Sequence, residues 1–549
     1  MEKIKRIFSS YRNALSLNTK YDKGWFIATF VLLVLYTEIV VSLHFSYFES
    51  LFSFLHIIFT IAIVPFVFII VWILARINCI TLYQSACNTE RSKKRFIFPS
   101  IVFGLTLAYF LLWFIAFYPG SFSNDSFIQY EQVISGEYNN WHPVLHTWLF
   151  FTLPIAIFDN IAMAVMMQII YFSLAITYLL YTLKRSGCPL WFILISWGYV
   201  ISNPNTAHIL LYPWKDTALT IFAIVIFTHL IRIYETGGKW LKKATNIFSF
   251  AIFLFLAIGM RHNSILLVAP LLVIIFVFIK NTRKNIIAVA GGLLLASLLL
   301  SGPVFKLAGV EEPGHRRIET LGLPLTVLSD VYMYDREALS DEAITFMDSL
   351  ATKEEWEKYH SSGNFNVLKF SVDESVFDKV EEEGAIKILG YTAEAVASSP
   401  AIALRAFSHL TCLVWGVAEC GDNTIPRAII DNLYGVEYSQ STVLTELLSL
   451  YSSVVSVVGK YLFNFIGILN AIMLFTAVAR IGKCGLQRAL IVIAPIAYNF
   501  GTMLLLTGPD FRFFYFNFLI IIPMIYLFFT KKDPKLSDCE VSDNKIIFQ

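Results

Sequence analysis

The sequence predicts an all-α polytopic membrane protein, and three observations support this fold class. Hydrophobic residues make up 57% of the 549 residues, whereas soluble globular proteins are about 45–50% apolar. The mean hydropathy is +0.65. Apolar runs of about 16–26 residues recur along the chain, and roughly 20 residues of helix cross the hydrocarbon core of a bilayer. The formal net charge of +2 argues against nucleic acid as a partner.

About twelve transmembrane helices are expected. The first run is too long for a signal-peptide core, and no small-residue cleavage site follows it, so we interpret it as a retained span. The candidate spans are 24–43, 51–76, 97–118, 161–183, 189–204, 213–234, 245–260, 264–281, 285–304, 449–477, 487–506 and 512–530.

Lysine and arginine predict the orientation because basic loops stay in the cytoplasm. If both termini are cytoplasmic, twelve spans place every basic cluster on the cytoplasmic side of a plasma membrane. This arrangement requires the apolar piece Pro143–Ile157, interrupted by Pro154, to be a juxtamembrane helix of a long first outer loop. A conventional hairpin there is the alternative, and it would put Lys184 and Arg185 outside. The basic clusters are 2–6, 91–95, 184–185, 239–243, 280–284, 480–488 and 531–535.

The hydropathy pattern divides the chain into four parts. The acidic insert could bury its own small core. It is interpreted either as a solvated cap over the outer face or as a lid that helps to bind an acceptor. The parts are an N-terminal transmembrane module (1–304) with first outer loop 119–160, an extracytoplasmic, mainly helical insert (305–448), C-terminal transmembrane helices (449–530) and a cytoplasmic tail (531–549).

Charged and polar residues gather at the predicted outer ends of the spans. The most informative stretch is 118–147, a polar strip that carries Asp125 and His142. Charged groups at a membrane boundary are costly and usually mark pathways or sites, so the site is expected on the outer face. The other groups are Asn203-Pro204-Asn205, Trp214-Lys215-Asp216, Arg261-His262-Asn263, His315-Arg316-Arg317 and Asp510-Phe511-Arg512.

Each of these groups also has a purely structural interpretation. Asp125 is a candidate N-cap of the helix that follows it, and His142 precedes a proline that suits a first helical turn. Lys215 and Asp216 are a candidate snorkelling pair at a helix start. The arginines are candidates for nonspecific contacts with lipid phosphates.

One carboxylate among several cations suggests a chemistry. A carboxylate can act as a general base toward a hydroxyl, while Arg and Lys stabilise charge growing on a phosphate leaving group. This predicts group transfer from a polyprenyl-phosphate carrier to an extracytoplasmic acceptor. The candidate catalytic residue is Asp125. The candidate substrate-binding residues are His142, Lys215, Asp216, Arg261, Asn263, Arg512 and Lys460.

Two charges lie within predicted spans. Glu38 is in the first span and Lys460 is in the tenth. Both are interpreted as snorkelling toward the outer interface. For Lys460 the alternative is an ion pair with a donor phosphate in a lateral groove.

Residues 97–305 resemble the GT-C superfamily of integral-membrane glycosyltransferases, in a bacterial-type branch. The likeness lies in an outer loop with an early Asp125 and a closing His142-Pro143, followed by the outer turns Lys215-Asp216 and Arg261-His262-Asn263. The resemblance implies a polyprenyl-phosphate-linked sugar donor and transfer with inversion to a glycan, cell-envelope polymer or lipid. It implies that Asp125 deprotonates the acceptor and that Lys215, Arg261 and Arg512 hold the donor phosphate.

The chain departs from the superfamily at Asn124-Asp125, where many relatives have two acids that help to hold a metal. Mg²⁺ or Mn²⁺ prefers oxygen ligands and usually more than one carboxylate, so dependence on either ion is left open. Asp216 and Glu131 are the candidates for a further ligand.

Two other functional classes are compatible with membrane lipids as partners. One is a transporter or flippase of a lipid-linked or anionic solute, although such proteins often show internal repeats and none is evident here. The other is a non-catalytic assembly protein that docks partners on the insert.

Cys412 and Cys420 are the two cysteines expected outside. On one continuous helix they would lie about 12 Å apart, too far for a disulfide. A bridge requires the helix to end between them, and Gly416 allows that.

Overall fold

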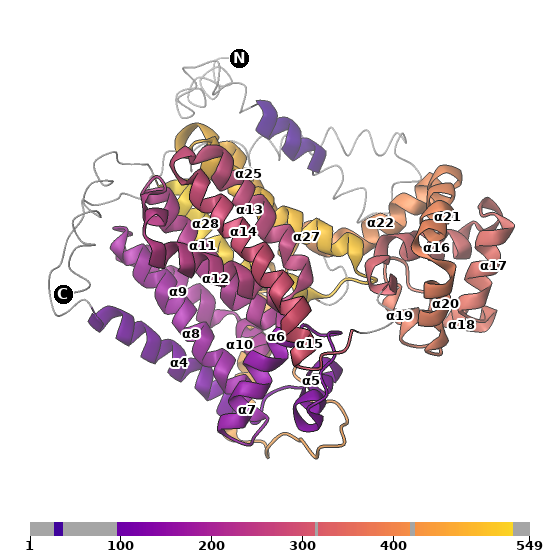
Figure 1. Ribbon diagram of the computed structural model, residues 1–549, viewed down its shortest axis with the longest axis horizontal. Coiled ribbons are helices and arrows are strands. Elements are labelled where there is room, and N and C mark those ends of the chain that lie inside the picture. The colour runs from indigo at the N-terminus through magenta and orange to yellow at the C-terminus, as the bar shows by residue number, and fades with distance from the viewer. Residues whose placement is uncertain (1–26, 37–95, 313–316, 418–422, 531–549) are drawn as a thin grey trace.

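The computed structural model describes residues 27–36, 96–312, 317–417 and 423–530. Within these ranges the chain is helical and has no β-strands; isolated bridges join Phe122 to Ile429 and Asn139 to Glu311. Figure 1 shows a bundle of long helices and, at one side, a smaller helical lobe. The predicted all-α class is therefore confirmed for the described residues.

Six described helical stretches are long and apolar enough to cross a membrane, and each falls on a predicted span. They are α4 (Ile97–Ala116), α8 (Ala162–Arg185), α11 (Lys215–Glu235), the run from η6 through α14 to α15 (Lys280–Leu307), the run from α26 to α27 (Leu486–Leu505), and η11 with α28 (Phe511–Phe529).

Shorter apolar helices fall on other predicted spans. Span 51–76 lies outside the described residues, so the count of twelve stays a prediction. The shorter helices are Ile27–Tyr36, α9 (Leu190–Ser202), α12 (Ala244–Met260), and η5 with α13 (His262–Phe278).

The prediction of one continuous helix over 449–477 is wrong. The structure divides this stretch into α23 (Val443–Val458), α24 (Lys460–Phe463) and α25 (Ile466–Cys484). Asn205 stabilises the break between α24 and α25: its side-chain nitrogen donates to the Phe463 carbonyl at 3.2 Å and to Asn464 Oδ1 at 3.1 Å. Irregular backbone in an apolar region is tolerated where protein groups satisfy it in this way.

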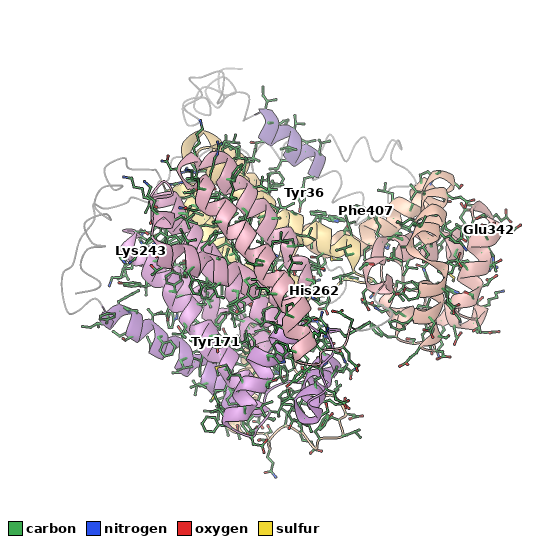
Figure 2. The ribbon with its side chains drawn as sticks, viewed as in Figure 1. Tyr36, Tyr171, Lys243, His262, Glu342 and Phe407 are labelled. Carbon is green, nitrogen blue, oxygen red and sulfur yellow. The ribbon has the colours of Figure 1, made fainter. Side chains whose placement is uncertain are left out.

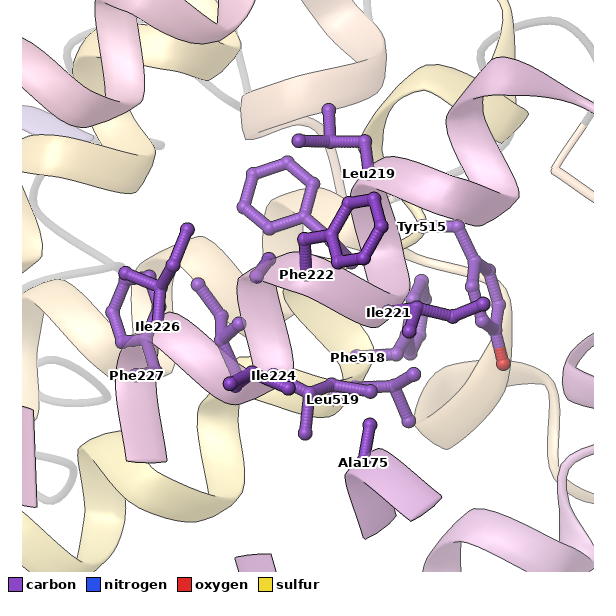
Figure 3. Close-up of a cluster of buried hydrophobic side chains, with 14 of the residues drawn as sticks. Ala175, Leu219, Ile221, Phe222, Ile224, Ile226, Phe227, Tyr515, Phe518 and Leu519 are labelled. Carbon is purple, nitrogen blue, oxygen red and sulfur yellow. The ribbon is translucent and has the colours of Figure 1, made fainter. Parts of the chain in front are cut away.

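Helices α11 and α28 occupy the centre of the bundle. Because α11 is apolar on all sides, it buries all of them, as expected for an interior helix. Figure 3 shows Ile221 and Ile224 of α11 beside Phe518 and Leu519 of α28, with Ala175 of α8 close by.

The first outer loop contains two short helices. The first, α5 (Asn124–Ser135), begins with a capping box in which the Ser123 and Ser126 side chains bond reciprocally to backbone N–H groups. The second is the apolar helix 144–157, built from α6, a π-helical segment (Thr147–Thr152) and α7. At 14 residues it is shorter than the six candidate spans.

The predicted insert, 305–448, contains two different parts. The first is the lobe, helices α16–α22, which has its own core around Val331, Met347 and Trp356. The helix bounds are α16 (Gly322–Tyr334), α17 (Asp341–Leu350), α18 (Lys353–Tyr359), α19 (Asn366–Lys369), α20 (Ser375–Glu383), α21 (Ala385–Ser398) and α22 (Pro400–Trp415).

The second part, residues 423–441, is extended, and we call it the strap. It crosses the first outer loop: Phe122 and Ile429 form a bridge, and the Ser439 N–H donates to the Tyr118 carbonyl at 2.9 Å. The Tyr434 ring stacks on Phe127 of α5 at 5.7 Å. The strap therefore holds α5 against the bundle.

The basic turns and the lobe lie on opposite sides of the molecule. Figure 2 shows Lys243, just before α12, on one side and Glu342 of the lobe on the other, with His262 between them. Which of these sides faces the cytoplasm stays a prediction.

Gly322→Ala is expected to loosen the junction between lobe and bundle. A Cβ atom at Gly322 would overlap the backbone of Leu506, so the variant should lose about 1–3 kcal/mol of stability. Gly390→Ala is the matched control because its added methyl would meet nothing within 4 Å and should be neutral or slightly stabilising. Thermal unfolding of both purified variants checks this, and equal unfolding temperatures would contradict it.

Candidate active site

Asp125 lies in the first turn of α5 and faces Arg512. Its Oδ2 atom is 3.2 Å from the terminal nitrogen of Arg512, and the two side chains are 26% and 17% exposed. The N-cap of α5 is Ser123, so the interpretation of Asp125 as the cap is wrong. The Asp125 carboxylate is thus available for an interaction outside its own helix.

Arg512 is surrounded by acids and one aromatic ring. It lies in η11 (Phe511–Phe514), and its Nε atom is 2.7 Å from Asp510 Oδ2 and 3.8 Å from Asp216 Oδ2. The guanidinium also lies over Trp214, 4.6 Å from the ring centroid. A planar guanidinium suits both stacking and bidentate contacts, and here it joins three segments of the chain.

Beneath this accessible pair lies a buried pair. Asp216, in the first turn of α11, forms an ion pair with Arg261 at the end of α12, and their side chains are only 1% and 7% exposed. The Arg261 guanidinium lies 3.9 Å from the centroid of the Phe513 ring. Since burying an unpaired charge is costly, each side chain requires the other. The pair therefore fixes the ends of α11 and α12 together.

His142 and Lys215 form the third contact. The Lys215 ammonium donates to Nδ1 of His142 at 3.0 Å. Burial lowers the pKa of His142 to about 3, and the Lys215 charge adds to the effect. A neutral imidazole that accepts at Nδ1 carries its proton at Nε2. That buried Nε2 has no hydrogen-bond partner among the described residues.

Electrostatics keep Asp125 ionised. Burial raises the pKa of this carboxyl, but the charges of Arg512 and Lys215 outweigh burial and hold the pKa well below its usual range. Together with Asp216, Asp510 and Arg261, the site holds three carboxylates and three cations. Its formal charges therefore balance before any ligand binds.

Two predicted substrate-binding residues are not joined to this cluster. Asn263 is half-buried in the 3-10 turn after Arg261, and the structure gives no hydrogen bond between it and the cluster. Lys460 begins α24, and its ammonium lies 5.8 Å from the centroid of the Phe465 ring. Glu38, His315, Arg316 and Cys420 lie outside the described residues.

Two further residues position the site: Trp214, which the sequence analysis placed in a group with Lys215 and Asp216, and Gln129, which it did not single out. Trp214 Nε1 donates to Ser123 Oγ at 2.8 Å, which ties the start of α5 to the start of α11, and its ring stacks on Tyr212 at 3.8 Å. Gln129 accepts hydrogen bonds from His146 at 2.6 Å and Thr147 at 3.2 Å. A tryptophan beside a span is a known interface signal, but its partner lies 91 positions away.

The acids present do not form a metal-binding set. No group of three or more His, Cys, Asp or Glu side chains placed to hold an ion is found among the described residues. Asp216 is committed to Arg261, and Glu131, the other candidate ligand, is exposed on α5.

Comparisons with known protein families, with curated proteins and with solved structures find no match for this chain. The resemblance to the GT-C superfamily therefore rests on the outer-loop residues Asp125 and His142-Pro143 and on the turns Lys215-Asp216 and Arg261-His262-Asn263.

The buried His142 predicts a pH dependence of stability. It binds a proton near pH 3 when folded and near pH 6.5 when unfolded, so stability should fall as pH drops from about 6.5 toward 3, by about 1.4 kcal/mol per pH unit. His142→Gln should remove that part of the slope. Thermal unfolding between pH 7.5 and 5.5 measures it, and identical slopes in wild type and variant would contradict it.

Proposed function

We propose that this protein is an inverting glycosyltransferase that moves a sugar from a polyprenyl-phosphate carrier to an extracytoplasmic glycan, cell-envelope polymer or lipid. The observation that carries the proposal is the Asp125–Arg512 pair: an ionised carboxylate and a phosphate-binding group, both partly exposed, with Arg512 at the start of the apolar stretch Phe511–Phe529. This depth suits a donor whose phosphate lies at the membrane boundary and whose isoprenoid tail stays in lipid.

Donor binding begins with an exchange of partners at Arg512. In the free protein the guanidinium contacts Asp125 and Asp510. A phosphate offers a guanidinium paired, charge-assisted hydrogen bonds and competes with these carboxylates. Lys215 and the Nε2–H of His142 supply further hydrogen-bond donors near Asp125.

The exchange turns Asp125 into a better base. Once a phosphate neutralises Arg512, the charge that lowers the pKa of Asp125 is compensated, while burial continues to raise that pKa. The carboxylate then takes the proton of the acceptor hydroxyl.

The transfer itself is a single displacement. The acceptor oxygen forms a bond to the anomeric carbon while the bond from that carbon to the phosphate oxygen breaks, so the configuration inverts. The electron pair leaves with the polyprenyl phosphate, and Arg512 and Lys215 stabilise the negative charge that develops there. The buried Asp216–Arg261 pair positions Lys215 and the start of α11 and takes no part in proton transfer.

Asp125→Asn is expected to lower transfer by at least about 100-fold, the range for loss of a general base, while the protein stays folded and still binds the donor. The assay measures polyprenyl phosphate released from a panel of lipid-linked sugars in the presence of a cell-envelope extract that supplies acceptors. The control is Asp159→Asn, which replaces an exposed acid in the same outer loop. This variant should keep full activity.

Two results would reject the enzyme assignment. One is an Asp125→Asn variant as active as wild type. The other is no release from any donor by a stable protein that moves labelled lipid-linked sugar or anionic solute across sealed vesicles. The second result would identify a transporter.

Arg512→Gln is expected to weaken donor binding by about 10–100-fold, because hydrogen bonds to a charged group contribute about 1.5–3 kcal/mol. Arg512→Lys should recover part of the loss, since it keeps the charge but not the planar fork. Arg336→Gln removes an exposed ion-paired arginine of the lobe and serves as the control. Binding is measured by microscale thermophoresis, and unchanged affinity in Arg512→Gln would contradict the role of this guanidinium.

A further inference from the structure

A second cationic site lies at the other end of the bundle. Helix α11 runs from Lys215 in the candidate active site to Glu235, and its 21 residues span about 30 Å at 1.5 Å per residue. Beyond it, a cleft of about 560 Å³ opens between two turns. Its lining residues are Lys242, Lys280, Asn281, Arg283, Lys284 and Asn285.

The two turns are held rigidly against each other. The turn η4 (Lys239–Lys242) follows Gly238, whose φ is +86°, and a Cβ at Gly238 would overlap the side chains of Ile279 and Thr282. The Asn285 side chain donates to the Leu241 carbonyl at 2.7 Å. The lysines of both turns are therefore held close together by the packing and hydrogen bonding of the backbone that carries them.

The cleft has unbalanced positive charge. Lys242, Lys280 and Lys284 are exposed, and none has an ion pair within the described part of the chain. Arg283 is used differently: it donates to the Phe276 and Val277 carbonyls at the end of α13. Three free ammonium groups and two amides, with no carboxylate in the lining, form a receptor for an anion such as a phosphate.

An apolar surface leads away from this cleft. Lys284, Ile287, Leu294 and Leu298 lie on one face of α14 (Arg283–Leu299). At 100° per residue, their positions fall within about 80° of one another around the helix axis. All three apolar side chains are about 60% exposed. This helix belongs to the span Lys280–Leu307, which buries little of its surface.

We propose that the cleft is a binding site for the headgroup of an anionic phospholipid, with an acyl chain along the exposed face of α14. Anionic lipids concentrate in the cytoplasmic leaflet and attract basic residues near the membrane surface, which matches the side predicted for these basic clusters. The site is separate from the Asp125 cluster and does not depend on the proposed transfer reaction.

The test compares retained lipid in the full-length protein. Wild type and Lys280→Gln/Lys284→Gln are purified in nanodiscs that contain phosphatidylglycerol and phosphatidylcholine, and bound lipids are counted by native mass spectrometry after release into detergent. We expect the double variant to bind phosphatidylglycerol about tenfold more weakly. The control variant, Lys353→Gln/Lys387→Gln, removes two exposed lysines of the lobe and should match wild type.

Two outcomes would overturn the proposal. One is equal retention of phosphatidylglycerol by the cleft variant and wild type. The other is that inorganic phosphate or glycerol phosphate displaces the lipid at equal concentration, which would show a site for a soluble anion. Because the readout is lipid binding, failure of the transferase assay leaves the result unaffected.

Discussion

The guanidinium of Arg512 joins segments that are nearly four hundred positions apart in the chain. It contacts Asp125 at the start of α5, stacks on Trp214 and faces Asp216 at the start of α11. Each of these acids is partly or wholly withdrawn from water, where an unpaired charge costs several kcal/mol. The arrangement of the outer loop, the central helix and the C-terminal span therefore depends on one cation held among carboxylates.

The surrounding structure keeps that cation in place. Thr507, a few residues before Arg512, accepts a hydrogen bond from Lys369 of the lobe at 3.0 Å, and its carbonyl accepts from the Asn366 N–H at 3.1 Å. On the other side the strap covers α5 through the stacking of Tyr434 on Phe127. Lobe and strap thus contact different segments next to the candidate active site. This makes the lid interpretation of the insert more specific, because the lobe contacts both the turn before Arg512 and, through Phe377 and Trp141, the loop that carries His142.

The two cationic sites differ in how their charge is balanced. At one end of α11 each cation has a carboxylate close by, so a ligand must displace an existing partner. At the other end the lysines of the cleft have no acid among its lining residues, so a ligand meets unbalanced charge. The first arrangement suits selective binding of a substrate that must also leave. The second suits lasting association with a membrane component.

The sequence by itself determined the all-helical membrane class, the places of six long spans and the residues of the candidate active site. Hydrophobic length and the cost of charge at a membrane boundary act locally, so both can be seen in the chain without knowing its fold. Tertiary structure alone decided that Asp125, Lys215, Arg261 and Arg512 meet while Lys460 does not join them. It also decided that the stretch 449–477 breaks after Phe463, because the Asn205 side chain that satisfies this break comes from a distant helix. Likewise, Trp214 orients α5 through a hydrogen bond to Ser123. Such contacts arise from packing between distant segments, and no local pattern of residues records them.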